Sequence, residues 1–335
     1  MRRVLPHTAE PRPQLSFYYE YQTELHKLFV ALGREHEWRG SPGELQDYTQ
    51  PRWVGVEHGN SDEKDQFTPD QEEAAQPILR DLGLVDEVLP RIGKYDQIAV
   101  VGGMMRVNRE RLQFIKNLLD KGNTRTNQLV FWGGERSRDD RDDAEITKMD
   151  IPSLASDRWV NSQLANGNHA DPYLGFPTET ELGRVAFVET FGVNSWHTAS
   201  ELRIKAGGKS AAPVYQVASN TFSIGHNNYP EFVLMNCPAV DRGDDRPPRH
   251  TTVSSAEEWL ATQAPPEDAR VLVVAGNPHI HRNLRDIQNV LKAKDRQEVK
   301  LEICGPPASP NASIQLYLGE IGRLLYMDTL LDKQS

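Results

Sequence analysis

The stretch QIAVVGGMMRVNRERLQFIKNLLD, residues 97–120, decides the fold class of this chain. It begins with a short apolar run, passes through a glycine pair and continues with a helical pattern of apolar residues. The first pattern is typical of a strand that is buried on both faces, and the second of an amphipathic helix. The sequence therefore predicts a strand over 97–101 and a helix over 107–120.

The same alternation of apolar runs and helical patterns continues to the C-terminus. Continuous apolar strands that alternate with helices indicate a parallel sheet covered on both faces. We therefore expect a doubly wound, mainly parallel, Rossmann-like α/β domain over residues 95–335, with the strands at 97–101 and 270–275 near its centre. Further strands are expected at 128–132, 213–218 and 299–303, and further helices at 179–191, 254–263, 280–293 and 312–326.

Residues 1–94 are expected to form a helical N-terminal section that caps the main domain. The stretch SFYYEYQTELHKLFVALG, residues 16–33, places apolar side chains on one face of a helix and ends at Gly33. A connector rich in Pro, Gly and Trp is expected over 38–60. The run Thr68-Pro69-Asp70-Gln71 then predicts a helix start, because Thr68 can cap the helix and Gln71 completes a capping box.

Two long segments, 135–177 and 219–250, interrupt the predicted alternation of strands and helices. Segments of this length in a compact domain are typically functional lids or disordered loops. Both follow predicted strand ends, so we expect insertions that close over a ligand.

Composition excludes several classes of protein. The formal charge of −10, from 48 acidic and 38 basic residues, argues against a general nucleic-acid binder. The aliphatic runs are far shorter than the ~20 residues of a membrane span, and no apolar secretory signal follows the first arginines. Two cysteines outside any CxxC motif exclude a disulfide framework and a zinc ribbon. We expect a cytoplasmic protein without a metal, and its oligomeric state stays open.

Small and polar residues follow every predicted strand. In open α/β sheets, ligands bind outside the carboxyl ends of the strands. Glycines there allow close backbone approach, and helix N-termini offer N–H groups to anions. Neither GxGxxG nor GxxxxGK[ST] is present, which argues against a standard dinucleotide site or P-loop. The predicted ligand-binding residues of these turns are Gly102, Gly103, Gly133, Gly134, Ser219, Asn220, Gly276 and Asn277.

Charged residues near these turns are candidates for ligand binding. Arg106 opens the helix after Gly102 and Gly103, where an arginine can fork onto a phosphate or carboxylate. The alternative is a solvated residue of the first helical turn. Arg282 lies in the segment GNPHIHR, three residues after His279, so the two share a helix face that suits an anionic ligand.

Three residues are candidates for catalysis. His279 lies closest to the end of the strand at 270–275 and can act as an acid or base, with a structural role as the alternative. Glu135 directly follows Gly134, which places it at a strand end. Glu179 opens a helix, where the helix dipole alone would also favour a glutamate. No regular spacing of a third ligand accompanies His279 and His281, so no metal site is predicted.

The order of these segments resembles that of the YdcF/SanA/ElyC-like family of bacterial domains of unknown function. In that family a glycine-rich strand end precedes a helix with an arginine, a second strand ends in an S-G-G-like turn, and a later strand leads to His and Arg three or four residues apart. Here Trp132 replaces the serine of the S-G-G-like turn. The S-x-N-T-x-E-N stretch of the family has three alternative positions here, at 219–221, 195–201 and 252–257. The matching residues are Gly102, Gly103, Gly133, Gly134, Glu179, His279 and Arg282.

The resemblance implies a Rossmann-like fold, and binding of S-adenosylmethionine, which is reported for a member of the family. Our first hypothesis is a protein that binds an adenosine-type or other anionic small molecule, with S-adenosylmethionine as the best single choice, and whether it is an enzyme stays open. A second hypothesis is a hydrolase or transferase acting on a nucleotide or sugar phosphate, with His279 as the acid or base. A third is a non-catalytic interaction protein that binds through its N-terminal helices and long loops.

Overall fold

The computed structural model describes residues 16–38, 40–54, 65–134, 179–191, 214–217, 223–224, 227–228, 230–237 and 250–332. The chain divides into two compact units. The helical unit spans Met1–Leu89, Ala275–Arg285 and Ile303–Ser335, and the sheet unit spans Pro90–Val274 and Asp286–Glu302. This differs from the expected division into 1–94 and 95–335, because two C-terminal segments belong to the helical unit.

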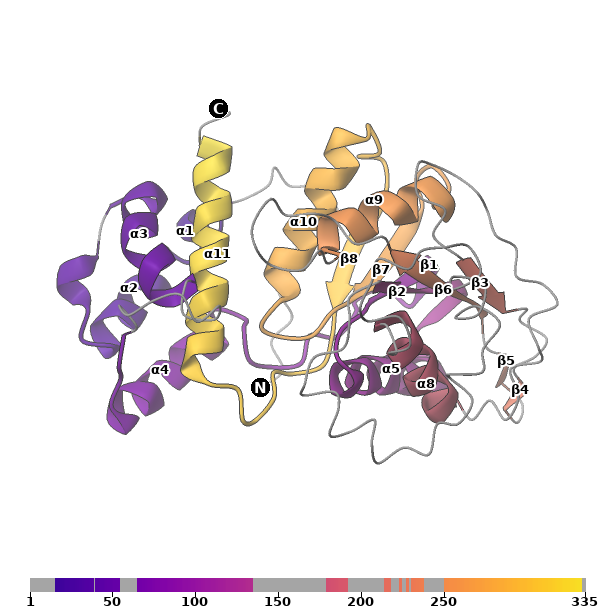
Figure 1. Ribbon diagram of the computed structural model, residues 1–335, viewed down its shortest axis with the longest axis horizontal. Coiled ribbons are helices and arrows are strands. Elements are labelled where there is room, and N and C mark those ends of the chain that lie inside the picture. The colour runs from indigo at the N-terminus through magenta and orange to yellow at the C-terminus, as the bar shows by residue number, and fades with distance from the viewer. Residues whose placement is uncertain are drawn as a thin grey trace, which may run out of the picture. The chain divides into compact units, whose positions relative to one another are not determined.

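A parallel α/β sheet forms the centre of the sheet unit, which confirms the predicted fold class (Figure 1). Within the described residues the strand order is β3-β6-β2-β1-β7-β8, and only β3 is antiparallel to its neighbour. The pairing of β1 with β7 is parallel, as predicted for the two central strands. The strands are β1 (Lys94–Val101), β2 (Arg125–Gly134), β3 (Val214–Val217), β6 (Glu231–Cys237), β7 (Arg270–Val274) and β8 (Lys300–Cys304).

Helices cover both faces of this sheet. In Figure 1, α5 and α8 lie on one face and α9 and α10 on the other. Phe131 and Trp132, which are consecutive in β2, show why both faces are buried. The ring of Phe131 packs against Gly183 of α8, whereas the ring of Trp132 lies 5.3 Å from that of Trp259 in α9. The helices are α5 (Met105–Asp120), α8 (Glu179–Phe191), α9 (Thr252–Thr262) and α10 (Ile280–Ala293).

The segment 219–250, which the sequence predicts to be an insertion, contains a strand of the sheet. Strand β6 pairs in parallel register with β2 and buries four consecutive apolar side chains, Phe232 to Met235. The expectation of an insertion is therefore corrected for these residues. The same segment also holds the short pair β4 (Ser223–Ile224) and β5 (Asn227–Asn228). The other predicted insertion, 135–177, lies outside the described residues.

The helical unit is built from the N-terminal helices and the last helix. The predicted capping box of Thr68 and Gln71 is present at the start of α4, and Gly33 has the left-handed φ of +67° at the end of α2. The predicted helix over 16–33 is broken at Tyr21. The predicted connector over 38–60 holds α3, because Ser41 accepts a hydrogen bond from the backbone N–H of Glu44. The elements are α1 (Phe17–Glu20), α2 (Gln22–Ala31), η1 (Glu35–Glu37), α3 (Pro42–Thr49), η2 (Gln50–Val54), α4 (Pro69–Asp81) and α11 (Ile314–Asp332).

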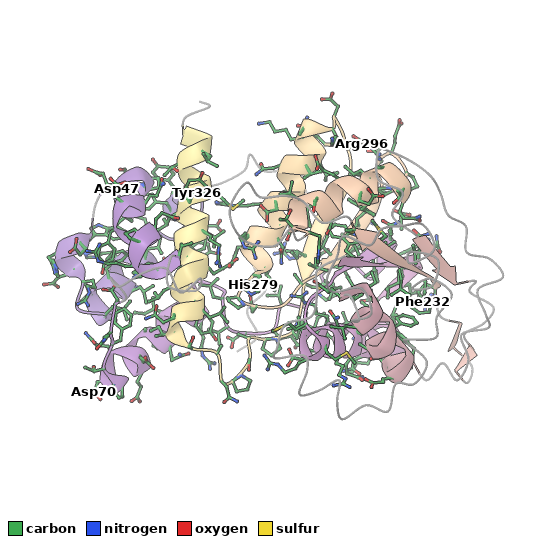
Figure 2. All side chains as sticks on the ribbon, in the orientation of Figure 1. Asp47, Asp70, Phe232, His279, Arg296 and Tyr326 are labelled. Carbon is green, nitrogen blue, oxygen red and sulfur yellow. The ribbon has the colours of Figure 1, made fainter. Side chains whose placement is uncertain are left out.

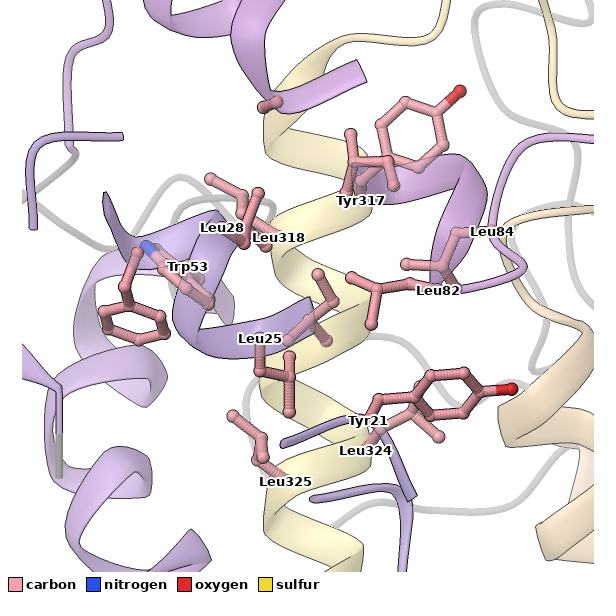
Figure 3. Packing of buried hydrophobic residues seen from close by; sticks show 14 of the residues in the cluster. Tyr21, Leu25, Leu28, Trp53, Leu82, Leu84, Tyr317, Leu318, Leu324 and Leu325 are labelled. Carbon is pink, nitrogen blue, oxygen red and sulfur yellow. The ribbon is translucent and has the colours of Figure 1, made fainter. Parts of the chain in front are cut away.

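Helix α11 forms the core of the helical unit together with α1 to α4. Figure 3 shows apolar side chains of the N-terminal helices gathered around α11, among them Leu25, Leu28 and Trp53 against the helix that carries Leu318 and Leu324. All five side chains are inaccessible to solvent. Burial of a leucine side chain contributes about 1.5–3 kcal/mol relative to exposure. This burial explains why the C-terminal helix joins the N-terminal section.

Two buried carboxylates fix the helices of this unit to one another. Asp328 of α11 accepts hydrogen bonds from the backbone N–H groups of Phe17 and Tyr18, at 3.1 and 2.7 Å, and pairs with Arg285. Asp65 accepts from the Tyr48 hydroxyl and from the indole of Trp53. Each carboxylate satisfies donors from separate segments, so its loss would leave several buried groups unpaired.

None of the helices in the described part of the chain has both the length and the apolar stretch that a membrane crossing requires.

Candidate functional site

The carboxyl ends of β1 and β2 bring together several of the predicted site residues. Counting only parallel strands, the order is third-second-first-fourth-fifth, so the direction of winding reverses between β1 and β7. Ligands of open α/β sheets bind at such a switch point, which here lies between β1 and β7, on the other side of β1 from β2. Gly102 and Gly103 directly follow β1, and Gly133 and Gly134 end β2.

The two glycine turns serve different purposes. A Cβ on Gly102 would lie 2.4 Å from the main-chain oxygen of Trp132 and 2.9 Å from Oε1 of Glu179. The first contact is with backbone, so the absence of a side chain at Gly102 is a requirement of the fold itself. A Cβ on Gly134 would lie 2.0 Å from Nδ1 of His250. Gly134 therefore makes room for an imidazole ring.

Glu179 and His250 form a buried pair above these glycines. Nε2 of His250 lies 3.4 Å from Oε2 of Glu179, and the side chains are 10% and 7% exposed. Glu179 is the first residue of α8, where the helix dipole stabilises a carboxylate. His250 directly precedes Thr251, the N-cap of α9. The two helix starts, on opposite faces of the sheet, thus present an acid and an imidazole at the same strand ends.

The first two turns of α5 carry two further side chains of this site, the amide of Asn108 and the guanidinium of Arg111. Arg111 donates from Nη1 to the main-chain oxygens of Val101 and Gly102, at 2.5 and 2.8 Å, and so fixes the end of β1. Asn108 lies one turn earlier and is inaccessible to solvent. No described residue offers a hydrogen-bond partner to either polar atom of its side-chain amide. A buried amide without partners costs free energy that a ligand with a donor and an acceptor would recover.

This arrangement can bind and position a polar ligand and move a proton. A deprotonated Glu179 accepts hydrogen bonds only, so it suits hydroxyl or ammonium groups. His250 has an Nδ1 with no partner among the described residues. An imidazole oriented by a carboxylate is a common proton-transfer arrangement.

Other predicted residues are not brought to this site. Arg106 is 51% exposed and lies 3.5 Å from Glu110 one turn on, which agrees with the alternative of a solvated first-turn residue. Glu135, Ser219 and Asn220 lie outside the described residues.

The predicted residues after β7 belong to the helical unit, where they contact the C-terminal helix and neighbouring loops. Nδ2 of Asn277 donates to the main-chain oxygen of Asp86, and its N–H donates to that of Pro306. Gly276 accepts from the N–H of His279. Helix α10 begins at Ile280, so Pro278 precedes the helix. His279 itself, labelled in Figure 2, lies immediately before α10.

Glu320 of α11 holds both charged residues of the predicted GNPHIHR motif. Nδ1 of His279 lies 3.0 Å from Oε2 of Glu320, and Nε of Arg282 donates to Oε1 at 2.9 Å. Burial raises the pKa of Glu320, but the combined effect of Arg282, His279 and Arg323 is larger and holds that pKa well below its ordinary value. Glu320 is therefore a buried carboxylate at neutral pH.

Sequence reasoning missed His250 and Glu320. His250 follows β6, which we expected within an insertion and not among the strands, so the strand-end rule was not applied to it. Glu320 carries no strand-end signal, since it lies in the middle of a helix and 41 residues after His279. The contact of Glu320 with His279 depends on which helix packs against the start of α10, and the sequence does not show this.

Among the described residues, no group of three or more His, Cys, Asp or Glu side chains could hold a metal ion. Comparisons of the chain with protein-family models, with curated proteins and with solved structures find no match.

Proposed function

We propose that the protein binds an adenosine-type small molecule at the carboxyl ends of β1 and β2, with S-adenosylmethionine as the preferred ligand and the YdcF-like family as its relatives. The observation that carries the proposal is the position of the Glu179 carboxylate, whose Oε1 would lie 2.9 Å from a Cβ on Gly102. This places a buried acceptor directly beside the turn that follows the first strand. The two hydroxyl groups of a ribose are donors that match it.

The same carboxylate favours an adenosine-type ligand over a phosphate ester at this site. Two like unit charges 4 Å apart repel by about 4 kcal/mol at an effective dielectric constant of 20. The ammonium and sulfonium groups of S-adenosylmethionine are attracted instead. Of the arginines that the structure describes near these strand ends, Arg106 is half-exposed beside Glu110 and Arg111 donates to the backbone, so neither is placed as a phosphate ligand.

Asn108 supports an adenine-type base. A side-chain amide can pair with the N6 and N7 edge of adenine through one donor and one acceptor. Both atoms of the buried Asn108 amide lack a partner among the described residues. Binding of such an edge would satisfy both atoms at once.

Isothermal titration of the full chain with S-adenosylmethionine, adenosine and ATP tests the proposal. We expect S-adenosylmethionine and adenosine to bind, and ATP to bind more weakly than either. Glu179→Gln should weaken binding by about tenfold or more, because a hydrogen bond to a charged group contributes about 1.5–3 kcal/mol. The matched control is Glu189→Gln in the same helix, whose carboxylate pairs with Arg109.

Three results would contradict the proposal. Tighter binding of ATP than of S-adenosylmethionine would favour a nucleotide or sugar-phosphate enzyme instead. Equal losses of affinity in Glu179→Gln and Glu189→Gln would remove Glu179 from the site. Absence of heat with every ligand at millimolar concentration would refute small-molecule binding of this class.

A further inference from the structure

The buried face of α5 contains one uncharged polar side chain, the amide of Asn108. It is inaccessible to solvent, and neither Oδ1 nor Nδ2 has a hydrogen-bond partner among the residues that the structure describes. The other buried side chains of this helix are apolar, apart from that of Arg111, which donates to the main-chain oxygens of Val101 and Gly102. Packing therefore encloses the Asn108 amide without compensating its lost hydrogen bonds to water.

An amide of this kind is an exception that calls for a cause. The large majority of buried side-chain polar atoms in native proteins have a hydrogen-bond partner. A side-chain amide offers an acceptor oxygen and a donor NH₂ group, so two kinds of partner are missing at Asn108. Replacement by an apolar side chain would remove the desolvation cost, which means that folding by itself does not require this amide.

The position of Asn108 relates the amide to the end of β1. Arg111, one turn later in α5, already reaches the last residue of that strand, and Asn108 lies nearer the start of the helix. A Cβ on Gly103 would lie 3.1 Å from Cγ1 of Val107, the residue before Asn108. The small residue after β1 thus brings the first turns of α5 close to the strand end, where the proposed ribose site lies.

The first turn of α5 is not fixed by a capping side chain. Its N-cap residue, Met104, makes no side-chain hydrogen bond to the helix start. In contrast, Thr251 and Ser254 form a complete capping box at the start of α9. A base that reaches Asn108 would enter at this uncapped turn of α5.

The chemistry of an amide restricts which purine can satisfy it. Adenine presents a donor and an acceptor side by side, the N6 amino group and N7, and an asparagine amide pairs with both. Hypoxanthine has an oxygen in place of the amino group, so the same edge carries two acceptors and the amide oxygen is left unpaired. A site built around a hydrogen bond rejects analogues that leave its buried polar groups without a partner.

We infer that Asn108 is the specificity-determining residue of the site: it reads the N6 and N7 edge of the base and restricts the ligand to a 6-aminopurine. The inference rests on the proposed function, in which Glu179 holds the ribose. The ligand-free chain is less stable for carrying an unpaired amide, and the ligand supplies both missing hydrogen bonds.

The first test compares nucleosides by isothermal titration of the full chain. We expect inosine and 7-deazaadenosine to bind more weakly than adenosine by about tenfold or more, because each fails to satisfy one atom of the amide. The analogue 1-deazaadenosine keeps N6 and N7 and should bind like adenosine. Discrimination against 1-deazaadenosine in place of 7-deazaadenosine would overturn the assigned edge.

The same titrations separate this inference from the proposed function. If adenosine and inosine bind equally well, the proposed function stands and the role of Asn108 is refuted. If no nucleoside binds, both are refuted.

The second test uses variants of Asn108. Asn108→Leu and Asn108→Ala should bind adenosine and inosine with equal, reduced affinity. The matched control is Asn117→Leu in the same helix, where the exposed amide accepts from Nε2 of Gln113, and this variant should retain the preference for adenosine. A preference retained in both Asn108 variants would overturn the inference.

Thermal unfolding without ligand gives a readout that does not depend on binding. Alanine is smaller and leucine larger than asparagine, so the two variants bracket the volume of the native side chain. At least one of them should unfold at the midpoint of the parent protein or above it, since an unpaired amide has been removed. Lower midpoints in both would show that the amide is held by partners in the folded chain, and would overturn its assignment to a ligand.

Discussion

Substitution of Gly134 by alanine tests the central contact of the sheet unit, the close approach of His250 to the end of β2. The added Cβ would lie 2.0 Å from Nδ1 and 2.2 Å from Cγ of the ring. Carbon atoms pack at about 3.5–4.0 Å, so the ring must move by roughly 1.5 Å. Overpacking of this kind costs about 1–3 kcal/mol. The pair with Glu179 would be broken by the same movement.

Urea denaturation, followed by circular dichroism, measures this loss. We expect Gly134→Ala to lower the free energy of unfolding by about 1–3 kcal/mol. In thermal unfolding each kcal/mol corresponds to about 2–4 °C for a domain of about 150–250 residues. The matched control is Gly93→Ala in the same unit, where the new Cβ would lie 3.4 Å from the main-chain oxygen of Asn123 and should be tolerated.

A double-mutant cycle separates the steric contact from other effects at this turn. In a His250→Ala background the ring is absent, so the three atoms closest to the added methyl group are removed. Gly134→Ala should then be neutral, or stabilising by about 0.4–1 kcal/mol through the lower entropy of the unfolded chain. If Gly134→Ala destabilises the protein equally with and without the imidazole ring, the placement of His250 over Gly134 is refuted. The same cycle, measured by ligand titration, shows whether displacement of His250 also weakens binding.

Two further predictions concern the helical unit. Asp328→Ala removes the partner of the buried Arg285 and of two backbone N–H groups, so we expect a loss of about 3–5 kcal/mol in urea denaturation, and an unchanged midpoint would contradict this. Burial, together with the hydrogen bond to Asp65, raises the pKa of Tyr48 above its ordinary value of about 10. The folded state then holds this proton more tightly than the unfolded chain, so its contribution is complete below about pH 10 and is lost as the pH rises further. Tyr48→Phe should lose less stability than the parent protein between about pH 9 and pH 11, and an identical decline in both would be evidence against the raised pKa.

The sequence by itself determines most elements of this fold. The helices at 179–191 and 280–293 have the predicted bounds, and the strands at 97–101 and 270–275 pair in parallel at the sheet centre. These features depend on local patterns, since an apolar run or a three-to-four spacing is visible without knowing its partner. The glycines after β1 and β2 and the carboxylate of Glu179 could be placed at the strand ends for the same reason.

Only the tertiary structure decides which surfaces cover these elements. The helical pattern of α11 shows that one face is apolar, but not that this face packs against Leu25 and Leu28 of the N-terminal section. Strand β6 carries an apolar run within a segment dominated by polar and turn-forming residues, and its pairing with β2 makes it a strand of the sheet. The pairs of His250 with Glu179 and of His279 with Glu320 join residues that are far apart in the chain. Such pairs form because packing brings distant segments of the chain together, and no local pattern of residues records that contact.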